Sequence, residues 1–299
     1  VEAAAIAADA DTISGINGAS GGNDVLNVLD GDTLNGVAVT LAQVDISVTS
    51  PATPASAGAP VPVLDVATGL ISVPAGTPAG SYSIDYEICE TLNPTNCASN
   101  TATIVVDAAP LVAANDSASG INGLTGATAV VNAFTADTVN GVAASPSNAV
   151  LSLAPGASVP TGLSFDTATG NVDVAAGTAA GTYSFDYQIC EALNPTNCRT
   201  ATISVTVEAA AIAADDDTAE PLQGGVDVAN VINIFENDTL NEARVTISDI
   251  SVTVLVPATH PGISLDILSG NVSVDSSVPA GAYSIEYRVC ENLNPPNCD

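Results

Sequence analysis

The chain has 299 residues and a formal net charge of −30 at pH 7, with 33 Asp and Glu residues against three Lys and Arg. Nucleic acids and anionic membrane surfaces are bound by clustered Lys and Arg, so this charge balance excludes both as partners. The hydrophobic fraction of 46% is too high for an acidic disordered chain. Ala, Val, Ile and Leu, with Thr and Ser between them, favour strands, so we predict an all-β protein. No apolar run reaches the roughly 18 residues of a membrane-spanning helix, and no membrane insertion is expected in this segment.

A nine-residue segment bounded by cysteines occurs three times, as CETLNPTNC at 89–97, CEALNPTNC at 190–198 and CENLNPPNC at 290–298. We call these segments the clasp loops. Pairs of aspartates separated by 21 residues recur in step with them: Asp11 and Asp32, Asp116 and Asp137, Asp217 and Asp238. A period of about a hundred residues is the size of one ordinary domain. The sequence therefore predicts three tandem domains, at 1–110, 111–209 and 210–299.

Turn residues separate short β-rich runs within each repeat. In the first repeat Asn35-Gly36 and Thr68-Gly69 are such turns, and Asn140-Gly141 follows in the second. Several short strands at this spacing predict a β-sandwich or a barrel. The run YSIDYEIC, at 82–89, alternates strictly between apolar and polar residues. One face of this strand is therefore predicted to point inward in all three repeats: Tyr82, Ile84, Tyr86 and Ile88; Tyr183, Phe185, Tyr187 and Ile189; Tyr283, Ile285, Tyr287 and Val289.

The strand after the second clasp loop alternates in the same way. TATISVTV, at 200–207, is predicted to bury Ala201, Ile203, Val205 and Val207 and to expose the Thr and Ser residues between them. Alternate residues of a strand lie on the same face. Cys198 is an even number of residues from the exposed threonines, and Cys190 is an even number of residues from the polar Asp186. Both sulfur atoms are therefore expected on the outer face of a hairpin formed by the last two strands of the repeat.

The C-x7-C spacing suits a disulfide that closes this hairpin. We predict the pairs Cys89–Cys97, Cys190–Cys198 and Cys290–Cys298. In the chain-entropy account each bridge adds about 2.5 kcal/mol to the free energy of unfolding, and three bridges indicate an oxidising compartment. The alternative, a metal site, needs four ligands at closer cysteine spacing, and no histidine lies in any clasp loop.

Two sets of motifs resemble a known class of protein. The segment PAGTPAGSYSIDYEICETLNPTNCASNTATIVV and its two copies resemble the tandem Ig-like repeats of large bacterial surface proteins of the adhesin type. The openings AADADTISG…VLNVLDGDTLN and AADDDTAEP…VINIFENDTLN resemble the starts of cadherin-like repeats in such proteins. The resemblance implies an Ig-like β-sandwich of about seven strands per repeat, exported and arranged in an extended series at a bacterial cell surface. The chain departs from antibody domains in lacking tryptophan and in placing its cysteines on the outside.

The two ends of the chain share a motif. VEAAAIAAD at 1–9 repeats 207–215, where it follows the last strand of the second repeat. The third repeat is therefore expected to lack its last strand within these residues. Either the chain is an excerpt of a longer array, as a start at Val1 instead of Met suggests, or the strand comes from another subunit, as in a donor-strand filament. We favour the longer array.

Catalytic motifs are weak in this sequence. His260 is the single histidine and lies beside Pro261 in a predicted loop. The many carboxylates show no pairing beyond what their number gives, and the glycines follow turns, not a phosphate-binding loop. We predict that the protein is not an enzyme, with no catalytic residues and no certain cofactor.

Calcium is a candidate ligand. Ca²⁺ takes six to eight oxygen ligands, and acidic residues gather at the start of each repeat and again about 21 residues later. The candidate metal ligands are Asp9, Asp11, Asp32, Asp116, Asp137, Asp215, Asp217 and Asp238. The alternative is that Asp stands there because it favours turns and solubilises the ends of the domains.

The leading hypothesis is a structural segment of an extracellular bacterial surface fibre or stalk, stapled by disulfides and non-catalytic. Its partners would be neighbouring copies of itself. The alternative is an adhesive module for a glycan or host surface, calcium-dependent in one version, with the LNPTN loops as adhesive tips. A plainer alternative for these loops is a tight turn shaped by Asn and Pro.

Overall fold

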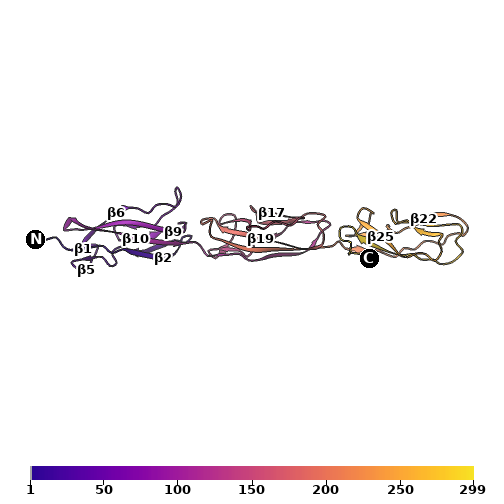
Figure 1. Cartoon of the computed structure of the whole chain (residues 1–299), viewed down its shortest axis with the longest axis horizontal. Helices are drawn as coiled ribbons and strands as arrows, with labels where there is room; N and C mark the ends of the chain where they lie inside the picture. Colours follow the sequence, from indigo (N-terminus) through magenta and orange to yellow (C-terminus); the bar gives the residue numbers. More distant parts are fainter. Residues whose placement is uncertain (1) are drawn as a thin grey trace. The chain divides into compact units, whose positions relative to one another are not determined.

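The computed structural model describes residues 2–299; Val1, with which the predicted first repeat begins, lies outside the described residues. These residues contain 28 strands and no helix, which confirms the prediction of an all-β fold (Figure 1). The strands form tandem β-sandwich repeats of Ig-like order. The exact domain boundaries and the extended arrangement of the repeats stay predictions.

The first repeat is a sandwich of a four-stranded and a three-stranded sheet, of order β2-β10-β9-β6 and β3-β8-β7, with a small sheet β1-β4-β5 beside them. The two larger sheets together hold the seven strands that the resemblance implies. The pairing of β2 with β10 is parallel, and the other pairings are antiparallel. The strands are β1 (Ile6–Ala7), β2 (Asp11–Asn17), β3 (Gly22–Asn27), β4 (Thr33–Leu34), β5 (Val37–Ala38), β6 (Val44–Ser50), β7 (Val63–Asp65), β8 (Leu70–Val73), β9 (Gly80–Glu90) and β10 (Asn93–Asp107).

The core of the first repeat lies between its two larger sheets. Ile71 of β8, Tyr86 of β9 and Ile104 of β10 are each fully buried in one apolar cluster. The cluster follows from the alternation of β9, because every second side chain of a strand points to the same face. The predicted inward face of β9 is confirmed, since Tyr82, Ile84, Tyr86 and Ile88 are all buried.

The second repeat has the same strand order, with sheets β12-β20-β19-β16, β13-β18-β17 and β11-β14-β15. The predicted inward residues of β20 are buried as expected. Its strands are β11 (Leu111–Val112), β12 (Asp116–Asn122), β13 (Ala127–Asn132), β14 (Thr138–Val139), β15 (Val142–Ala143), β16 (Ala149–Leu153), β17 (Leu163–Phe165), β18 (Asn171–Val174), β19 (Gly181–Glu191) and β20 (Cys198–Glu208).

The third repeat keeps its three-stranded sheet β22-β27-β26 and the small sheet β21-β23-β24, but its larger sheet has only β25 and β28. No strand follows the third clasp loop within the described residues. Residues 217–223, which correspond to β2 and β12, also form no strand, and this was not predicted. The strands are β21 (Ile212–Ala213), β22 (Val228–Asn233), β23 (Thr239–Leu240), β24 (Ala243–Arg244), β25 (Ile250–Val256), β26 (Ile263–Leu265), β27 (Asn271–Val274) and β28 (Glu286–Glu291).

The inward face predicted for the strand before the clasp loop is wrong for most of the third repeat. Val289 is buried, but Tyr283, Ile285 and Tyr287 are only half-buried, and β28 starts at Glu286. The physical reason is the missing neighbour, because a strand with one unpaired edge loses both ladder hydrogen bonds and apolar cover. In the second repeat Tyr183 is likewise half-buried, whereas Phe185, Tyr187 and Ile189 are buried.

The chain divides into two compact units, and the division passes through the second repeat. The first unit holds Val1–Ala114, Phe134–Ala154 and Gln188–Ala201; the second holds Asn115–Ala133, Pro155–Tyr187 and Thr202–Asp299. Each junction between consecutive repeats therefore lies inside one unit, where its contacts are defined.

Candidate functional site: clasp loops and aspartate–tyrosine nodes

Each clasp loop is closed by a disulfide across the hairpin of the last two strands. Cys97 pairs with Cys89 in the ladder of β9 and β10. The bonds are Cys89–Cys97, Cys190–Cys198 and Cys290–Cys298, with S–S distances of 2.01, 2.03 and 2.07 Å. The first two bridges are half-buried at the outer face of the hairpin, but Cys290 is buried, which differs from the predicted outward position.

A buried glutamate inside the clasp loop organises the turn, and the sequence analysis missed it. The Glu191 side chain is 1% exposed. Its Oε1 accepts from Asn194 Nδ2 at 2.9 Å, and its Oε2 accepts from Asn197 Nδ2 at 2.8 Å and from the Ala109 N–H at 3.1 Å. Hydrogen bonds to an ionised acceptor are stronger than neutral ones, and here they take the place of a cation. The clasp loop is thus hydrogen-bonded to Ala109, in the segment that precedes the first strand of its own repeat.

The same arrangement recurs in the other repeats. Asn197 Nδ2 also donates to the Ala109 carbonyl at 2.8 Å, so both polar groups of Ala109 are held. In the third repeat the corresponding residues are Glu291, Asn294, Asn297 and Ala210. In the first repeat Glu90 accepts from Asn93 and Asn96, and these two hydrogen bonds lower the pKa of Glu90. The signal was present in the sequence, as Glu follows the first cysteine and Asn stands three and six residues later each time.

The clasp loop also contacts the preceding repeat. Asn194 Oδ1 accepts the backbone N–H of Ala79 at 2.7 Å, within the first unit. Asn294 Oδ1 accepts the N–H of Ala180 at 2.6 Å, within the second unit. One asparagine amide therefore bonds its own glutamate through nitrogen and the previous repeat through oxygen. Asn194 and Asn294 are both only 7% exposed.

A second pair of side chains completes each junction. Asn17 Nδ2 donates to Asn140 Oδ1 at 2.7 Å, and Asn140 Nδ2 donates to Ser20 Oγ at 2.9 Å. At the next junction Asn122 Nδ2 donates to Asn241 Oδ1 at 2.7 Å. We call the clasp-loop contact and this asparagine pair together the repeat joint. Its parts recur at both junctions, so the joint is a regular feature of the chain.

The first clasp loop differs in its surroundings. Leu92 is 87% exposed and Asn93 is exposed, whereas Leu193 and Leu293 at the same place are half-buried. The expectation that all three loops serve as equal adhesive tips does not fit this arrangement, because the second and third loops are engaged in joints. The plainer hypothesis of a turn shaped by Asn is closer, but the asparagines bond other segments as well as the turn.

Aspartates gather around a tyrosine hydroxyl in the first and third repeats, and we call these groups the aspartate–tyrosine nodes. Tyr86 Oη donates to Asp11 Oδ2 at 2.9 Å and lies 2.9 Å from the Asp9 carbonyl. The Asp9 N–H donates to Asp32 Oδ1 at 2.7 Å. Asp32 is fully buried, and its Oδ2 has no hydrogen-bond partner within the described residues. The structure thus brings together three of the predicted metal ligands around Tyr86.

The node of the third repeat has the same plan. There Tyr287 Oη donates to Asp217 Oδ2 at 2.9 Å, and the Asp215 N–H donates to Asp238 Oδ1 at 2.9 Å. In the second repeat Tyr187 Oη donates to Asp116 Oδ2 at 3.1 Å within the second compact unit. Asp137 Oδ1 accepts the Ala114 N–H at 2.6 Å within the first compact unit.

Burial governs the titration of these groups. Desolvation raises the pKa of Asp32 to about 6, against the hydrogen bond from Asp9, and nearby Asp11 and Asp9 raise it further. Desolvation likewise raises the pKa of Asp238 to about 6. The pKa of Asp11 and that of Asp217 are also raised by burial. Removing water disfavours the charged carboxylate, which is why all four shifts have one sign.

The nodes fit a cation only in part. The orphaned buried Oδ2 of Asp32 is an oxygen that a cation would satisfy. Within residues 2–299, the potential metal ligands whose donor atoms all lie within 4.8 Å of one another are Glu87, Cys89 and Cys97. Both of these sulfur atoms are bonded to each other in a disulfide. The three carboxylates of the first node are more widely spread than that. A calcium ion would therefore need them to draw together.

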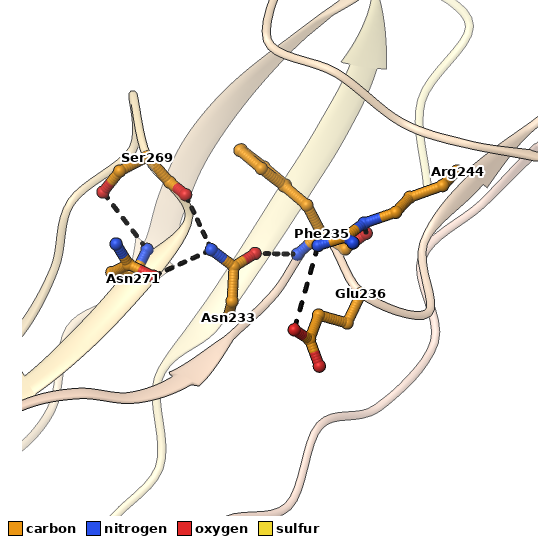
Figure 2. A network of polar contacts seen from close by, with 6 residues as sticks. All are labelled: Asn233, Phe235, Glu236, Arg244, Ser269 and Asn271. Atoms are coloured by element: carbon orange, nitrogen blue, oxygen red, sulfur yellow. Dashed lines mark hydrogen bonds and ion pairs between the residues drawn. The ribbon is translucent and has the colours of Figure 1, made fainter.

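The third repeat holds a polar network around Arg244, one of the three cations. Its members are Asn233, Phe235, Glu236, Arg244, Ser269 and Asn271 (Figure 2). Arg244 Nε donates to the Phe235 carbonyl at 2.9 Å, and Arg244 Nη2 lies 3.9 Å from Glu236 Oε1 in an exposed ion pair. Asn233 Oδ1 accepts the Phe235 N–H at 2.9 Å. An exposed ion pair contributes at most about 1 kcal/mol, so this network mainly shapes the turn before β23.

The single histidine lies in a local turn. His260 Nδ1 accepts the Gly262 N–H at 3.1 Å, and its ring centroid is 6.4 Å from that of Tyr283. Residues 2–299 contain no helix that is long and apolar enough to span a membrane.

No family model matches the sequence, and no curated protein is similar to it. Among solved structures the chain resembles cadherins. Drosophila N-cadherin EC1-3 is 12% identical, with 96% of this chain and 94% of that chain covered and a TM-score of 0.40. Human CDH23 EC21-23 is 12% identical over 95% and 92% of the two chains, with a TM-score of 0.31. Protocadherin gammaB7 EC3-6 is 11% identical over 97% and 96%, with a TM-score of 0.26. These values identify no family for the chain.

Proposed function

We propose that the chain is a structural segment of an extracellular bacterial surface fibre or stalk, built from the repeats 1–110, 111–209 and 210–299. The observation that supports this most is the repeat joint, in which Asn194 bonds both Glu191 and the Ala79 backbone. A joint of this kind resists bending between neighbours, because moving one repeat breaks the partly buried hydrogen bonds of Asn194, whose side chain is buried. Neighbouring copies of the repeat are then the main partners.

The disulfides fit a mechanical role. Each bridge closes the turn of its hairpin, and the second and third hairpins carry the joints, so a pulling force cannot open those turns. The composition also suits an exposed setting. The chain has no lysine, and trypsin could cut only after three arginines.

Single-molecule stretching of the 299-residue chain tests the proposal. When a repeat unfolds, the contour length should increase by the length of the repeat minus the eight residues that its disulfide keeps from extending. Reduction with dithiothreitol should add about 28 Å per repeat, at roughly 3.5 Å per residue. A chain with the Cys97→Ser and Cys89→Ser substitutions gives the matched control for one loop. A featureless extension without discrete unfolding steps would overturn the load-bearing role.

A second candidate function is calcium-dependent stiffening or adhesion, and the observation that favours it is the orphaned Oδ2 of buried Asp32. Asp9, Asp11 and Asp32 would hold an ion in the first repeat. Asp215, Asp217 and Asp238 would do so in the third. The ion would stabilise the charged forms of Asp32 and Asp238, which burial disfavours. Ca²⁺ in excess over EDTA should raise the melting temperature at pH 7.5 by mass action; an unchanged value would end this candidate.

Adhesion to a glycan or host surface is the remaining alternative, and the exposed Leu92 of the first clasp loop favours it. Leu92→Ser and Asn93→Ala together should abolish attachment to cells or glycan arrays if this loop is an adhesive tip. Ala192→Ser in the second clasp loop is the control.

A further inference from the structure

The loop between β6 and β7 of the first repeat is longer than the loops at the same place in the other repeats. It covers residues 51–62, whereas the corresponding loops cover residues 154–162 and 257–262. Its sequence is PATPASAGAPVP, and we call it the proline loop. All of it belongs to the first compact unit. The extra residues are not required by the fold, since the second repeat has the same strand order without them.

The composition of the proline loop differs from that of the chain as a whole. Four of its residues are proline and none is charged, although the chain has 33 Asp and Glu residues. Proline has no N–H to donate, so the loop is a poor partner for a sheet ladder. The other residues are Ala, Gly and Val, with two hydroxyl groups, on Thr53 and Ser56. Ser and Thr together with proline are typical of O-glycosylated segments.

The proline loop is not hydrogen-bonded to its sandwich. Within residues 2–299 its one hydrogen bond is internal, from the Ala59 N–H to the Ser56 carbonyl at 3.0 Å. The loop at the same place in the second repeat is fixed, because the Gly162 carbonyl accepts the Ala175 N–H at 2.8 Å and Thr178 Oγ1 at 3.2 Å. The proline loop can therefore be drawn into an extended shape without the loss of a hydrogen bond to the sandwich.

The two ends of the proline loop are anchored, and its middle faces solvent. Ala52 is 6% exposed and Pro62 is buried, whereas residues 53–58 are all exposed. The hydroxyls of Thr53 and Ser56 form no hydrogen bond within the part of the chain that the structure describes. Both hydroxyls are thus accessible to an enzyme that binds this segment in a cleft, because a loop with so few contacts changes its shape at little cost.

We propose that the proline loop is a site of O-linked glycosylation, with Thr53 and Ser56 as the acceptor residues. The co-substrate is a sugar whose anomeric carbon is activated as a phosphate ester. The hydroxyl oxygen attacks the anomeric carbon, the bond from that carbon to the phosphate oxygen breaks, and the phosphate leaves with the electron pair. The hydroxyl proton passes to a base of the transferase. The inference goes beyond the proposed function, because it concerns one loop and holds whether or not the chain carries load.

The charge of the chain favours a sugar over a phosphate group on these hydroxyls. A phosphate adds about 1.5 to 2 negative charges and is stabilised where arginines surround it. The chain already has a net charge of −30, and its three cations, Arg199, Arg244 and Arg288, all lie outside the first repeat. A phosphate on the proline loop would therefore have no cation of its own repeat to pair with, whereas a neutral sugar needs none.

A glycan at this place would also cover an exposed edge of the sandwich. β6 is the edge strand of its sheet, and its residues 46–50 carry no charge. Val48 is 38% exposed there. Proteins protect such edges with charged side chains or covering segments, because a bare edge pairs with other chains. A bulky, hydrated glycan attached just after β6 supplies this cover.

Mass spectrometry of the protein isolated from the surface of the cells that produce it tests the proposal. Cleavage before aspartate releases residues 45–64 as one peptide. Its mass should exceed that of the sequence by whole sugar residues, and electron-transfer fragmentation should place the added mass on Thr53 or Ser56. Residues 137–165 of the second repeat, released in the same digest, are the internal control. They should have the mass of their sequence, because their loop is fixed to the sandwich.

Two variants expressed in the same cells complete the test. Thr53→Ala with Ser56→Ala should abolish the added mass and leave the circular dichroism spectrum unchanged, because both side chains are exposed. Thr49→Ala with Ser50→Ala, on β6, should keep the added mass.

Four results would each overturn the proposal. They are a 45–64 peptide with the mass of its sequence, added mass in equal proportion on residues 137–165, added mass that alkaline phosphatase removes, and added mass that persists in the Thr53→Ala, Ser56→Ala chain. None of these results changes the unfolding steps expected on stretching, so the two proposals fail separately.

Discussion

Asn194 accepts a 2.7 Å hydrogen bond from the backbone N–H of Ala79, a residue 115 positions earlier in the chain. The contact is partly buried at a junction between repeats, and the nitrogen of the same amide donates to Glu191. Both the oxygen and the nitrogen of the Asn194 amide therefore form hydrogen bonds, and a substitution at this position removes at least one of these two hydrogen bonds.

Asn194→Ala should lower the free energy of unfolding of the first compact unit by about 1–3 kcal/mol more than Asn93→Ala does, because it removes the acceptor of the Ala79 N–H as well as the donor to buried Glu191. Chemical denaturation followed by circular dichroism measures the change. Asn93→Ala is the matched control, since it removes only the donor to Glu90 in the first clasp loop. Equal losses for the two variants would contradict the role given to the joint.

Removing one bridge by Cys190→Ser with Cys198→Ser should cost about 2–3 kcal/mol of stability, the loop-closure value for nine residues. It should also loosen Ala109, because the turn that places Glu191 and Asn197 is no longer fixed. Hydrogen exchange at the Ala109 amide is the measurement. Exchange that stays as slow as in the parent chain would show that the turn holds without its disulfide.

Asp32 gives a pH dependence of definite sign. Burial raises its pKa to about 6 in the folded chain, above the value near 4 of an unfolded chain. The folded state then binds more protons between these values, so its contribution to stability is full below pH 4 and is lost as the pH rises through 6. Asp32→Asn should therefore increase the free energy of unfolding at pH 7, on the order of 1–3 kcal/mol, with a much smaller effect at pH 4. Exposed Asp45→Asn is the control, and a gain independent of pH would count against this explanation.

A turn in the third repeat carries backbone strain. The two-residue turns of the first two repeats are Asn35-Gly36 and Asn140-Gly141, with both residues at positive φ, as a hairpin turn of this kind requires. In the third repeat Glu242 takes the glycine position with φ of 63°. Glu242→Gly should stabilise this repeat by about 1 kcal/mol, because a left-handed conformation costs a residue with a Cβ atom about that much. Glu242→Ala keeps the Cβ and should leave the melting temperature nearly unchanged.

Much of the fold could be predicted because it depends on local alternation. The inward faces of β9 and β20 follow from period-two patterns that pairing with both neighbours preserves. The same pattern failed at Tyr283 and Ile285, because their burial depends on pairing with a neighbouring strand and not on the residues alone. Residues 217–223 form no strand for the same reason, since β2 and β12 pair in parallel with the strands that follow the first two clasp loops, and no such strand lies within the described residues of the third repeat.

The site was predicted in part. The pattern of aspartates did lead to the nodes around Tyr86 and Tyr287, but the tyrosine hydroxyls were assigned only to the core. Glu191 was missed although Glu-x-x-Asn-x-x-Asn recurs in every clasp loop, because a buried carboxylate without a cation is an unusual solution. The contact between Asn194 and Ala79 joins two repeats, and no spacing within one repeat could indicate it.

The two joints are assembled from interchangeable parts: an asparagine, a glutamate and an alanine on one side, and an alanine N–H on the other. Duplication or deletion of one whole repeat would therefore create a new boundary whose two surfaces already match. A tandem chain built in this way can change in length without a compensating substitution in the repeats that remain.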